Sequence, residues 1–254
     1  NIKKIFPNIR LIYSAHNYFP LCSRVDLWQD DKFANGHNCN KQSYAECINC
    51  YDQAKYYLEI FRRKHPFKNS RQKIKKIARY FPDRGDINSY SIYHERLISF
   101  LNNEVDCVLA VSKRVKKIFE EHGVNSDKIT VSYIGNDMAD VQLNKCAADI
   151  NADPFRLLYM GYARRVKGFD FFIKALKDLP DEYASKMILR IASHLDSDYE
   201  KIVDGIKGKF AGFEFYDGYS RDNQKEILTD VNLGVVPIMW EDNLPQVGIE
   251  QIAS

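Results

Sequence analysis

The stretch RLLYMGYARRVKGFDFFIKAL, residues 156–176, decides the fold. It opens with a continuous apolar run, which is typical of a strand buried on both faces. It closes with Phe169, Phe172, Ile173 and Leu176 at helical spacing. A basic loop that contains glycine joins these two parts. A buried strand followed by an amphipathic helix is the repeating unit of a parallel sheet.

The same strand–helix unit recurs along the chain. Strands are expected in IRLIYSAH near the start and at residues 105–112, 128–134, 187–193, 213–219 and 233–239, whereas residues 21–60 read as irregular. Ser112 is placed to cap the helix after one of these strands, and Gly123 to end it. The sequence predicts an α/β protein with two Rossmann-like domains, residues 1–140 and 150–254.

Composition narrows the class of protein. With 45% apolar and 28% charged residues, the 254-residue chain is typical of a folded protein, and a net charge of +3 does not indicate a dedicated nucleic-acid binder. No run approaches the roughly 18 apolar residues of a membrane span. The first residue is Asn rather than Met, so we expect a piece of a longer protein with both domains incomplete.

The loop GYARRVKG, residues 161–168, has the composition of a phosphate site. Gly161 lets the backbone approach a ligand, Arg164, Arg165 and Lys167 supply cationic donors, and a helix begins directly behind them. The loop matches neither the dinucleotide fingerprint nor the phosphate-binding loop of nucleotide triphosphatases. A solvated basic turn is the alternative.

The segment EDNLPQVGIE, residues 241–250, follows the last apolar run. Asp242 and Glu250 are eight residues apart, too far for one helical turn, so the first carboxylate belongs to a loop and the second to a helix. A carboxylate can accept two hydrogen bonds from a vicinal diol, which is how sugars and riboses are commonly held. The alternative is that the loop acids cap the helix and that Glu250 is merely exposed.

In this order, the basic loop and the acidic segment resemble the retaining glycosyltransferases of family four, which have the two-domain GT-B fold. The segment from VDCVLAVS to VSYIGND, residues 105–137, is similar to the end of their N-terminal domain, and the start, with HNY at 16–18, resembles the loop that brings a histidine towards the donor sugar. The resemblance implies a metal-independent, hexosyltransferase-like enzyme that moves a sugar from a UDP- or GDP-sugar to a saccharide or lipid-linked acceptor, with retention, in surface polysaccharide biosynthesis.

The resemblance also implies a role for individual residues. Lys167 and an arginine of its loop would hold the diphosphate, Glu250 the ribose, and Asp242 the donor sugar, while His16 would lie near the reacting sugar. The remaining donor-binding residues are then expected to be Gly161, Arg164, Arg165, Glu241, Asn243, Pro245, Gln246 and Val247. Two positions depart from the family: Tyr162 stands where Arg is usual, and Asp242 where Glu is usual. Either Arg164 or Arg165 could replace the missing arginine, and Glu241 could replace Asp242.

Four of the six cysteines, Cys22, Cys39, Cys47 and Cys50, gather after the first strand. They include one close C-x-x-C pair, whereas zinc sites usually show two, so a structural zinc clip competes with unliganded thiols. No cofactor is expected for catalysis, because fixed cations can neutralise a departing diphosphate. A reduced, cytoplasmic setting is the expected environment.

Residues 61–79 carry nine Lys or Arg and no acid. A solvated basic helix and an anchor on an anionic membrane, which would place the protein peripherally on the inner membrane face, are the two interpretations. Two alternatives to an enzyme stay open: a noncatalytic nucleotide-sugar binder, and a nucleic-acid-binding protein that uses the cysteines and the basic segment. Nucleic-acid binding would leave the later α/β block unexplained, so we expect no nucleic-acid partner.

Overall fold

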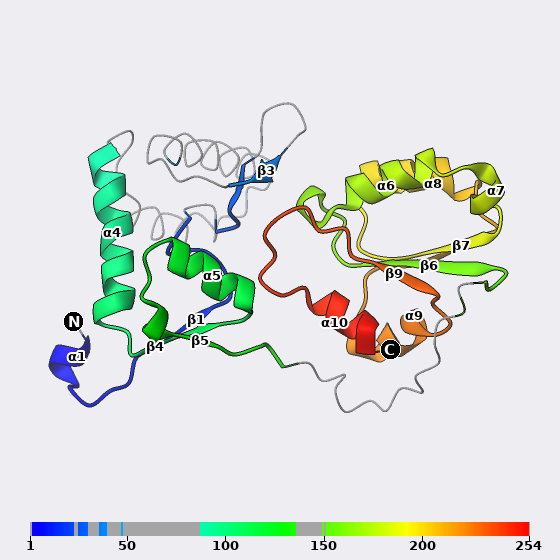
Figure 1. Cartoon of the computed structure of the whole chain (residues 1–254). Helices are drawn as coiled ribbons and strands as arrows, with labels where there is room; N and C mark the ends of the chain where they lie inside the picture. Colours follow the sequence, from blue (N-terminus) through cyan, green and yellow to red (C-terminus); the bar gives the residue numbers. More distant parts are fainter. Residues whose placement is uncertain are drawn as a thin grey trace, which may run out of the picture. The chain divides into compact units, whose positions relative to one another are not determined.

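The computed structural model describes residues 2–22, 25–29, 36–39, 47, 87–135, 149 and 151–253. The chain divides into two compact units, residues 1–134 and 135–254 (Figure 1). Each unit contains a parallel sheet combined with helices, so the predicted α/β class is confirmed. None of the helices in the described part of the chain has the length and apolar character needed to cross a bilayer.

Unit 1 is built on a three-stranded parallel sheet in the order β1-β4-β5. Its main elements are α1 (Ile2–Ile5), β1 (Ile12–Ala15), α4 (Ile87–Asn103), β4 (Cys107–Ala110), α5 (Lys113–Glu121), η1 (Ser126–Lys128) and β5 (Ile129–Val131). The Ser112 hydroxyl accepts a hydrogen bond from the Val115 N–H at 3.2 Å, and Gly123 follows α5 at a φ of 88°. Both helix signals read from the sequence are therefore confirmed.

The segment after β1 contains a feature that the sequence did not predict. Within the described residues, β2 (Trp28–Gln29) pairs antiparallel with β3 (His37–Asn38). A Cβ on Gly36 would overlap the Trp28 indole, so this short hairpin needs a glycine beside the ring. Strands of two residues leave no period in the sequence, which explains why this segment read as irregular.

Unit 2 is built on a four-stranded, fully parallel sheet in the order β8-β7-β6-β9. Its elements are β6 (Phe155–Met160), η3 (Arg165–Lys167), α6 (Phe169–Asp178), α7 (Asp181–Ala184), β7 (Met187–Ala192), α8 (Ser197–Lys207), β8 (Gly212–Tyr216), α9 (Arg221–Leu228), β9 (Leu233–Val235) and α10 (Gln246–Ala253). The helix predicted from the phenylalanine spacing is confirmed, because Phe169, Phe172, Ile173 and Leu176 are all buried on α6.

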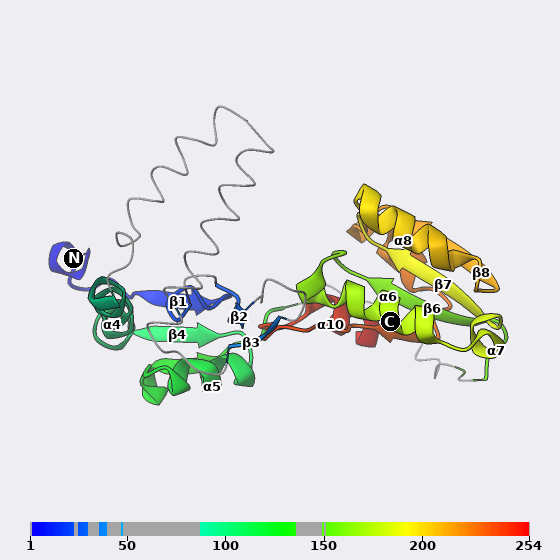
Figure 2. The same ribbon diagram turned by 90° about the horizontal axis from the view of Figure 1, so that it is seen from above.

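Two layers of helices cover the sheet of unit 2, with α6 and α8 on one face and α9 and α10 on the other (Figures 1 and 2). Alternate residues of β6 separate the two cores: Tyr159 packs with α6 and α8, whereas Leu158 and Met160 pack with α9. The chain leaves β6 towards β7 on one side and returns as β9 on the other. In such a sheet, a crevice opens at the carboxyl ends of the two strands where the winding reverses.

The last strand is shorter than the sequence suggested. The apolar run 233–239 predicted one strand, but β9 pairs with β6 only over Leu233–Val235. Pro237 has no N–H to donate to a ladder, so the chain leaves the sheet just before it. The residues after this strand are free to shape a loop at the crevice.

Candidate functional site

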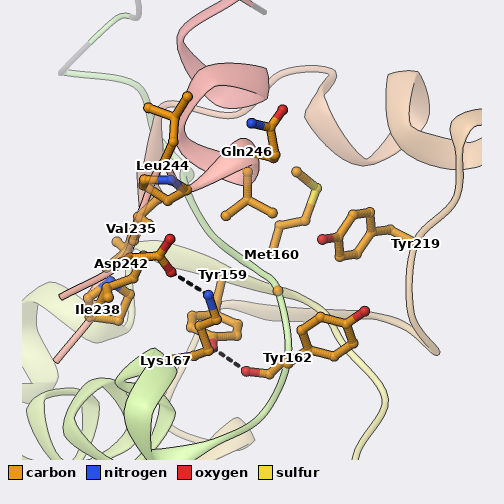
Figure 3. Close-up of a pocket in the computed structure, with 15 residues that line it drawn as sticks. Tyr159, Met160, Tyr162, Lys167, Tyr219, Val235, Ile238, Asp242, Leu244 and Gln246 are labelled. Carbon is orange, nitrogen blue, oxygen red and sulfur yellow. Dashed lines mark hydrogen bonds and ion pairs between the residues drawn. The ribbon is translucent and has the colours of Figure 1, made fainter. Parts of the chain in front are cut away.

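A pocket of about 210 Å³ lies at the carboxyl ends of β6 and β9, and we name it the β6–β9 pocket (Figure 3). The strand ends contribute its apolar wall. Its polar groups belong to Tyr159, Tyr162, Lys167, Tyr219, Asp242 and Gln246. The pocket therefore occupies the crevice that the topology predicts.

The loop 161–168 is fixed by its backbone. The Tyr159 hydroxyl donates a hydrogen bond to the Tyr162 carbonyl at 2.8 Å, and the Arg164 N–H donates to the same carbonyl at 2.8 Å. Gly168 has a φ of 77°, and a Cβ there would overlap the carbonyl oxygen of Pro237. Only glycine allows this contact, which presses the basic loop against the segment behind β9.

Lys167 and Asp242 meet in the pocket as an ion pair between Nζ and Oδ2 (Figure 3). The Asp242 side chain is only 11% exposed and that of Lys167 29%, so the pair is partly desolvated. The Lys167 ammonium also lies 5.1 Å from the centre of the Trp240 ring. Two loops 75 residues apart in the sequence thus deliver a cation and an anion to one point.

Glu250 lies on α10, and its Oε2 atom is buried without a hydrogen-bond partner among the described residues. The Nε2 atom of Gln246, one turn earlier and on the pocket wall, is in the same condition. Burial raises the pKa of Tyr219 to about 12, and the charge of the Glu250 carboxylate contributes to this rise. Glu250 itself is not among the residues that line the β6–β9 pocket. Buried polar atoms without protein partners are uncommon and point to a ligand or to water.

The loop that carries Tyr219 is held by a pair that the sequence reading missed. His194 Nδ1 and Asp217 Oδ1 are 2.8 Å apart, at the carboxyl ends of β7 and β8. Gly218, at a φ of 82°, lies directly against the His194 ring. The next residue, Tyr219, lines the pocket. The sequence offered only a glycine in a strand-end loop as a signal for this arrangement.

The other residues expected at a donor site lie at several places. Gly161, Pro245, Gln246 and Val247 line the β6–β9 pocket. Glu241 lines a neighbouring groove of about 610 Å³, and Asp242 belongs to the walls of both hollows. Asn243 directly follows these two acids in sequence, on the same loop. His16 belongs to unit 1, where it is exposed directly after β1.

The predicted zinc ligands are described only in part, because Cys50 lies outside the described residues. Among the residues that the structure does describe, no three His, Cys, Asp or Glu side chains are grouped to hold a metal ion. The fit of a zinc ion to this cysteine cluster therefore stays a prediction.

Comparison with curated proteins finds one similar sequence, which is named as a glycosyltransferase. Over 111 residues the chain is 27% identical to an uncharacterized glycosyltransferase of Methanocaldococcus jannaschii, an alignment that covers 42% of this chain and 28% of the relative. The chain is thus similar to a glycosyltransferase, as its motifs indicated. No protein-family profile matches the chain.

Solved structures show partial likenesses. Anabaena HepE in complex with UDP matches with a TM-score of 0.49 and 17% identity over 63% of this chain and 46% of that one. An α,α-trehalose-phosphate synthase (UDP-forming) from Burkholderia vietnamiensis matches with a TM-score of 0.44 and 16% identity over 68% and 48%. The chain spans less than half the length of each of these proteins. Because the TM-scores are below 0.5, these likenesses do not identify the ligand or the reaction of this chain.

Proposed function

We propose that the protein is a glycosyltransferase whose unit 2 binds a nucleotide-sugar donor in the β6–β9 pocket. The observation that carries this proposal is the combination of the Lys167–Asp242 pair with the buried Oε2 of Glu250, which has no hydrogen-bond partner among the described residues. A cation suits a diphosphate, and a carboxylate with a spare acceptor suits the ribose diol. The similarity to the archaeal glycosyltransferase supports the same interpretation.

The two hollows that share Asp242 suggest how the donor is divided. The nucleotide would occupy the β6–β9 pocket, with its diphosphate at Lys167, and the sugar would extend past Asp242 into the groove lined by Glu241. Lys167 must then exchange its partner Asp242 for phosphate oxygens, which frees the Asp242 carboxylate to accept hydrogen bonds from the sugar. Which of the two acids holds the sugar would be resolved by exchanging each for its amide.

Bond cleavage in a nucleotide sugar develops negative charge on the departing diphosphate. Lys167, fixed near that position, stabilises this charge more in the transition state than in the ground state. We propose retention, in line with the family resemblance: the anomeric carbon–phosphate oxygen bond breaks, the acceptor oxygen bonds to that carbon from the same face, and its proton passes to the phosphate. The part assigned to His16, near the reacting sugar, rests on the resemblance alone.

The direct test is turnover. The protein is incubated with a panel of UDP- and GDP-sugars and saccharide or lipid-linked acceptors, and release of nucleoside diphosphate is measured together with the anomeric configuration of the product. We expect one donor to be turned over with retention. Donor binding without turnover would establish the noncatalytic binder instead. Nucleic-acid binding with no nucleotide-sugar binding would establish the third alternative.

We also propose that catalysis needs no metal ion. With the leaving diphosphate neutralised by side chains, turnover is expected to survive EDTA, and a strict requirement for added Mg²⁺ or Mn²⁺ would contradict this. A zinc clip in the cysteine segment would be detected separately by metal analysis of the purified protein. Loss of turnover together with loss of zinc and of folded structure would indicate a structural ion.

The basic segment 61–79 lies outside the described residues, and its docking on anionic lipid is a proposal from sequence. Sedimentation with acidic vesicles at low salt, with release as the salt rises, is the expected result, because screening shortens the reach of the field to about 8 Å at physiological salt. Surface polysaccharide biosynthesis with a lipid-linked acceptor would make such docking useful. Equal binding to neutral and acidic vesicles would contradict electrostatic docking.

A further inference from the structure

The basic loop contains two neighbouring arginines, and they interact with different tyrosines. Arg164 precedes η3, and its guanidinium carbon lies 5.3 Å from the centre of the Tyr162 ring. Tyr162 is 58% exposed and lines the β6–β9 pocket. The guanidinium of Arg164 thus lies against a ring that lines the cavity.

Arg165 is the first residue of η3 and is not among the residues that line the β6–β9 pocket. Its positive charge lowers the pKa of Tyr199, a residue of α8. The Tyr199 ring packs edge-on against Phe169, with centres 5.0 Å apart, and belongs to the core face between α6 and α8. Burial raises the pKa of Tyr199, the hydrogen bond to Asp170 raises it further, and Arg165 lowers it. The charge of Arg165 thus influences a tyrosine of α8, whereas the guanidinium of Arg164 lies at the Tyr162 ring.

The backbone of Tyr162 is held in place. Two hydrogen bonds of 2.8 Å reach the Tyr162 carbonyl, one from the Tyr159 hydroxyl and one from the Arg164 N–H. Because these bonds use the backbone of Tyr162, they position the side chain without depending on it. The ring therefore projects from a fixed backbone, and the Arg164 guanidinium lies over it.

We propose that Arg164 is the second phosphate-binding cation of the pocket, that Tyr162 is the residue that positions it, and that Arg165 does not contact the ligand. This inference rests on the proposed function, because it names the partner of Lys167 within the same site. A guanidinium that stacks by its face keeps its edge N–H donors free for two phosphate oxygens. Stacking also restricts a long side chain before the ligand arrives, which lowers the entropic cost of binding.

The test is calorimetric titration with two pairs of probes, UDP with uridine and GDP with guanosine. Phosphate contacts affect only the diphosphates, so each nucleoside serves as the internal control for its diphosphate. Arg164→Ala is expected to weaken diphosphate binding about tenfold or more and to leave nucleoside binding unchanged, because a hydrogen bond to a charged group is lost. Arg165→Ala, the matched control, is expected to stay within about twofold of the wild type for all probes.

The positioning role has its own variants. Tyr162→Leu removes the ring and is expected to weaken diphosphate binding about threefold, whereas Tyr162→Phe keeps the ring and is expected to restore wild-type affinity. Arg164→Lys, which keeps the charge without the planar fork, is expected to fall between the wild type and Arg164→Ala. Thermal unfolding of each variant shows whether the fold is intact.

The results overturn the inference in distinct ways. A larger loss for Arg165→Ala than for Arg164→Ala would give the role to Arg165. An equal loss of nucleoside and diphosphate binding in Arg164→Ala would show a structural effect. If the wild type binds the diphosphates but neither arginine matters, the inference fails while the proposed function stands. If the wild type binds neither diphosphate, both fail.

Discussion

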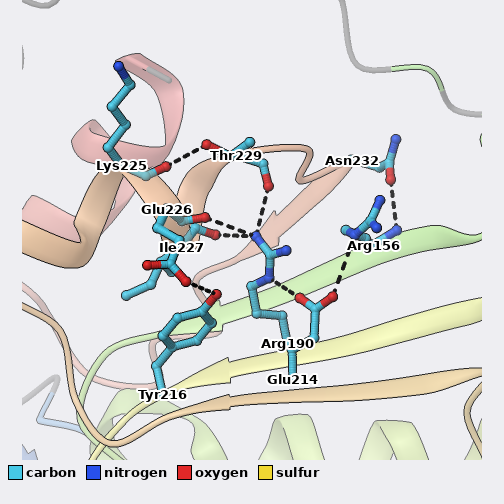
Figure 4. A network of polar contacts seen from close by, with 9 residues as sticks. All are labelled: Arg156, Arg190, Glu214, Tyr216, Lys225, Glu226, Ile227, Thr229 and Asn232. Carbon is cyan, nitrogen blue, oxygen red and sulfur yellow. Dashed lines mark hydrogen bonds and ion pairs between the residues drawn. The ribbon is translucent and has the colours of Figure 1, made fainter.

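Arg190 and Lys167 are two cations on the same sheet, and their surroundings differ. Arg190, on β7, is 6% exposed, and its Nη1 donates to the carbonyls of Ile227 at 2.6 Å and Thr229 at 2.8 Å (Figure 4). Its Nε pairs with Glu214 on the neighbouring strand. These carbonyls end α9, so the charge of Arg190 meets the negative end of a helix.

The β6–β9 pocket contrasts with this network. Lys167 has one carboxylate, Asp242, and an aromatic face. Two buried atoms of α10, Glu250 Oε2 and Gln246 Nε2, have no partner among the described residues. Saturated hydrogen bonding around a buried charge stabilises a fold, whereas unsatisfied atoms around a partly exposed charge leave room for a ligand. The contrast predicts that Arg190 serves stability and Lys167 serves binding.

Replacing Lys167 by Ala is expected to have the largest effect on function. It removes the charge that stabilises the leaving diphosphate, and kcat/KM should fall about 10²-fold or more. Steady-state kinetics with the donor found in the turnover screen measure this loss. Lys174, an exposed lysine of α6, supplies the matched control. Activity of Lys167→Ala within a few-fold of the Lys174→Ala control would remove Lys167 from the site.

Replacing Arg190 by Met should affect stability instead. The free energy of unfolding should fall by about 2–3 kcal/mol, because Glu214 and the carbonyls at the end of α9 lose their donor. The diphosphate affinity of the folded protein should not change. Denaturant unfolding and calorimetry measure the two quantities. Arg156→Met is the control, since Arg156 is 3.7 Å from Glu214 and 30% exposed. An affinity loss without a stability loss would reverse the assignment.

Replacing Glu250 by Gln tests the unsatisfied carboxylate. Diphosphate and nucleoside affinities should both fall about tenfold, because the ribose contact is shared by both ligands. Unfolding of the ligand-free variant should be no easier than that of the wild type, since the buried Oε2 has no partner among the described residues to lose. Glu226→Gln is the control, because Glu226 accepts from Tyr216 at the Arg190 network. A less stable variant with wild-type affinity would make Glu250 structural.

The smallest effect on stability is expected for Tyr216, whose exposed hydrogen bond lies at the edge of the polar contacts around Arg190. The Tyr216 hydroxyl donates to Glu226 Oε1 at 3.0 Å in an exposed contact. Tyr216→Phe should lower the free energy of unfolding by about 0.5–1 kcal/mol and leave nucleotide binding as it is. A loss as large as that of Arg190→Met, measured by the same unfolding experiment, would mean that the network depends on its exposed edge.

Local patterns predicted much of the fold. The phenylalanine spacing of α6, the Ser112 cap and the Gly123 stop are confirmed because each depends on residues within one or two turns. β9 was predicted too long because the apolar run continues past Pro237, although proline has no N–H to donate to the ladder. An arginine within the apolar run of β7 gave no sign that its partners would be the carbonyls of α9.

The residues of the candidate site could be predicted, but the contacts between them could not. Sequence and resemblance named Lys167, Asp242 and Glu250, yet their pairing depends on two loops that meet only in the folded unit. Tyr219 was missed because its position reads as the end of a strand, whereas it follows the loop in which Asp217 pairs with His194. Side chains positioned by a distant loop leave no periodic signal.

The most direct measurement is a crystal structure of the protein with a nucleoside diphosphate bound. The account predicts phosphate oxygens within hydrogen-bond distance of Lys167 Nζ, with Asp242 released from that lysine. It also predicts a ribose hydroxyl donating to Oε2 of Glu250. A nucleotide bound elsewhere, with the Lys167–Asp242 pair intact and Glu250 untouched by the ligand, would contradict the central claim.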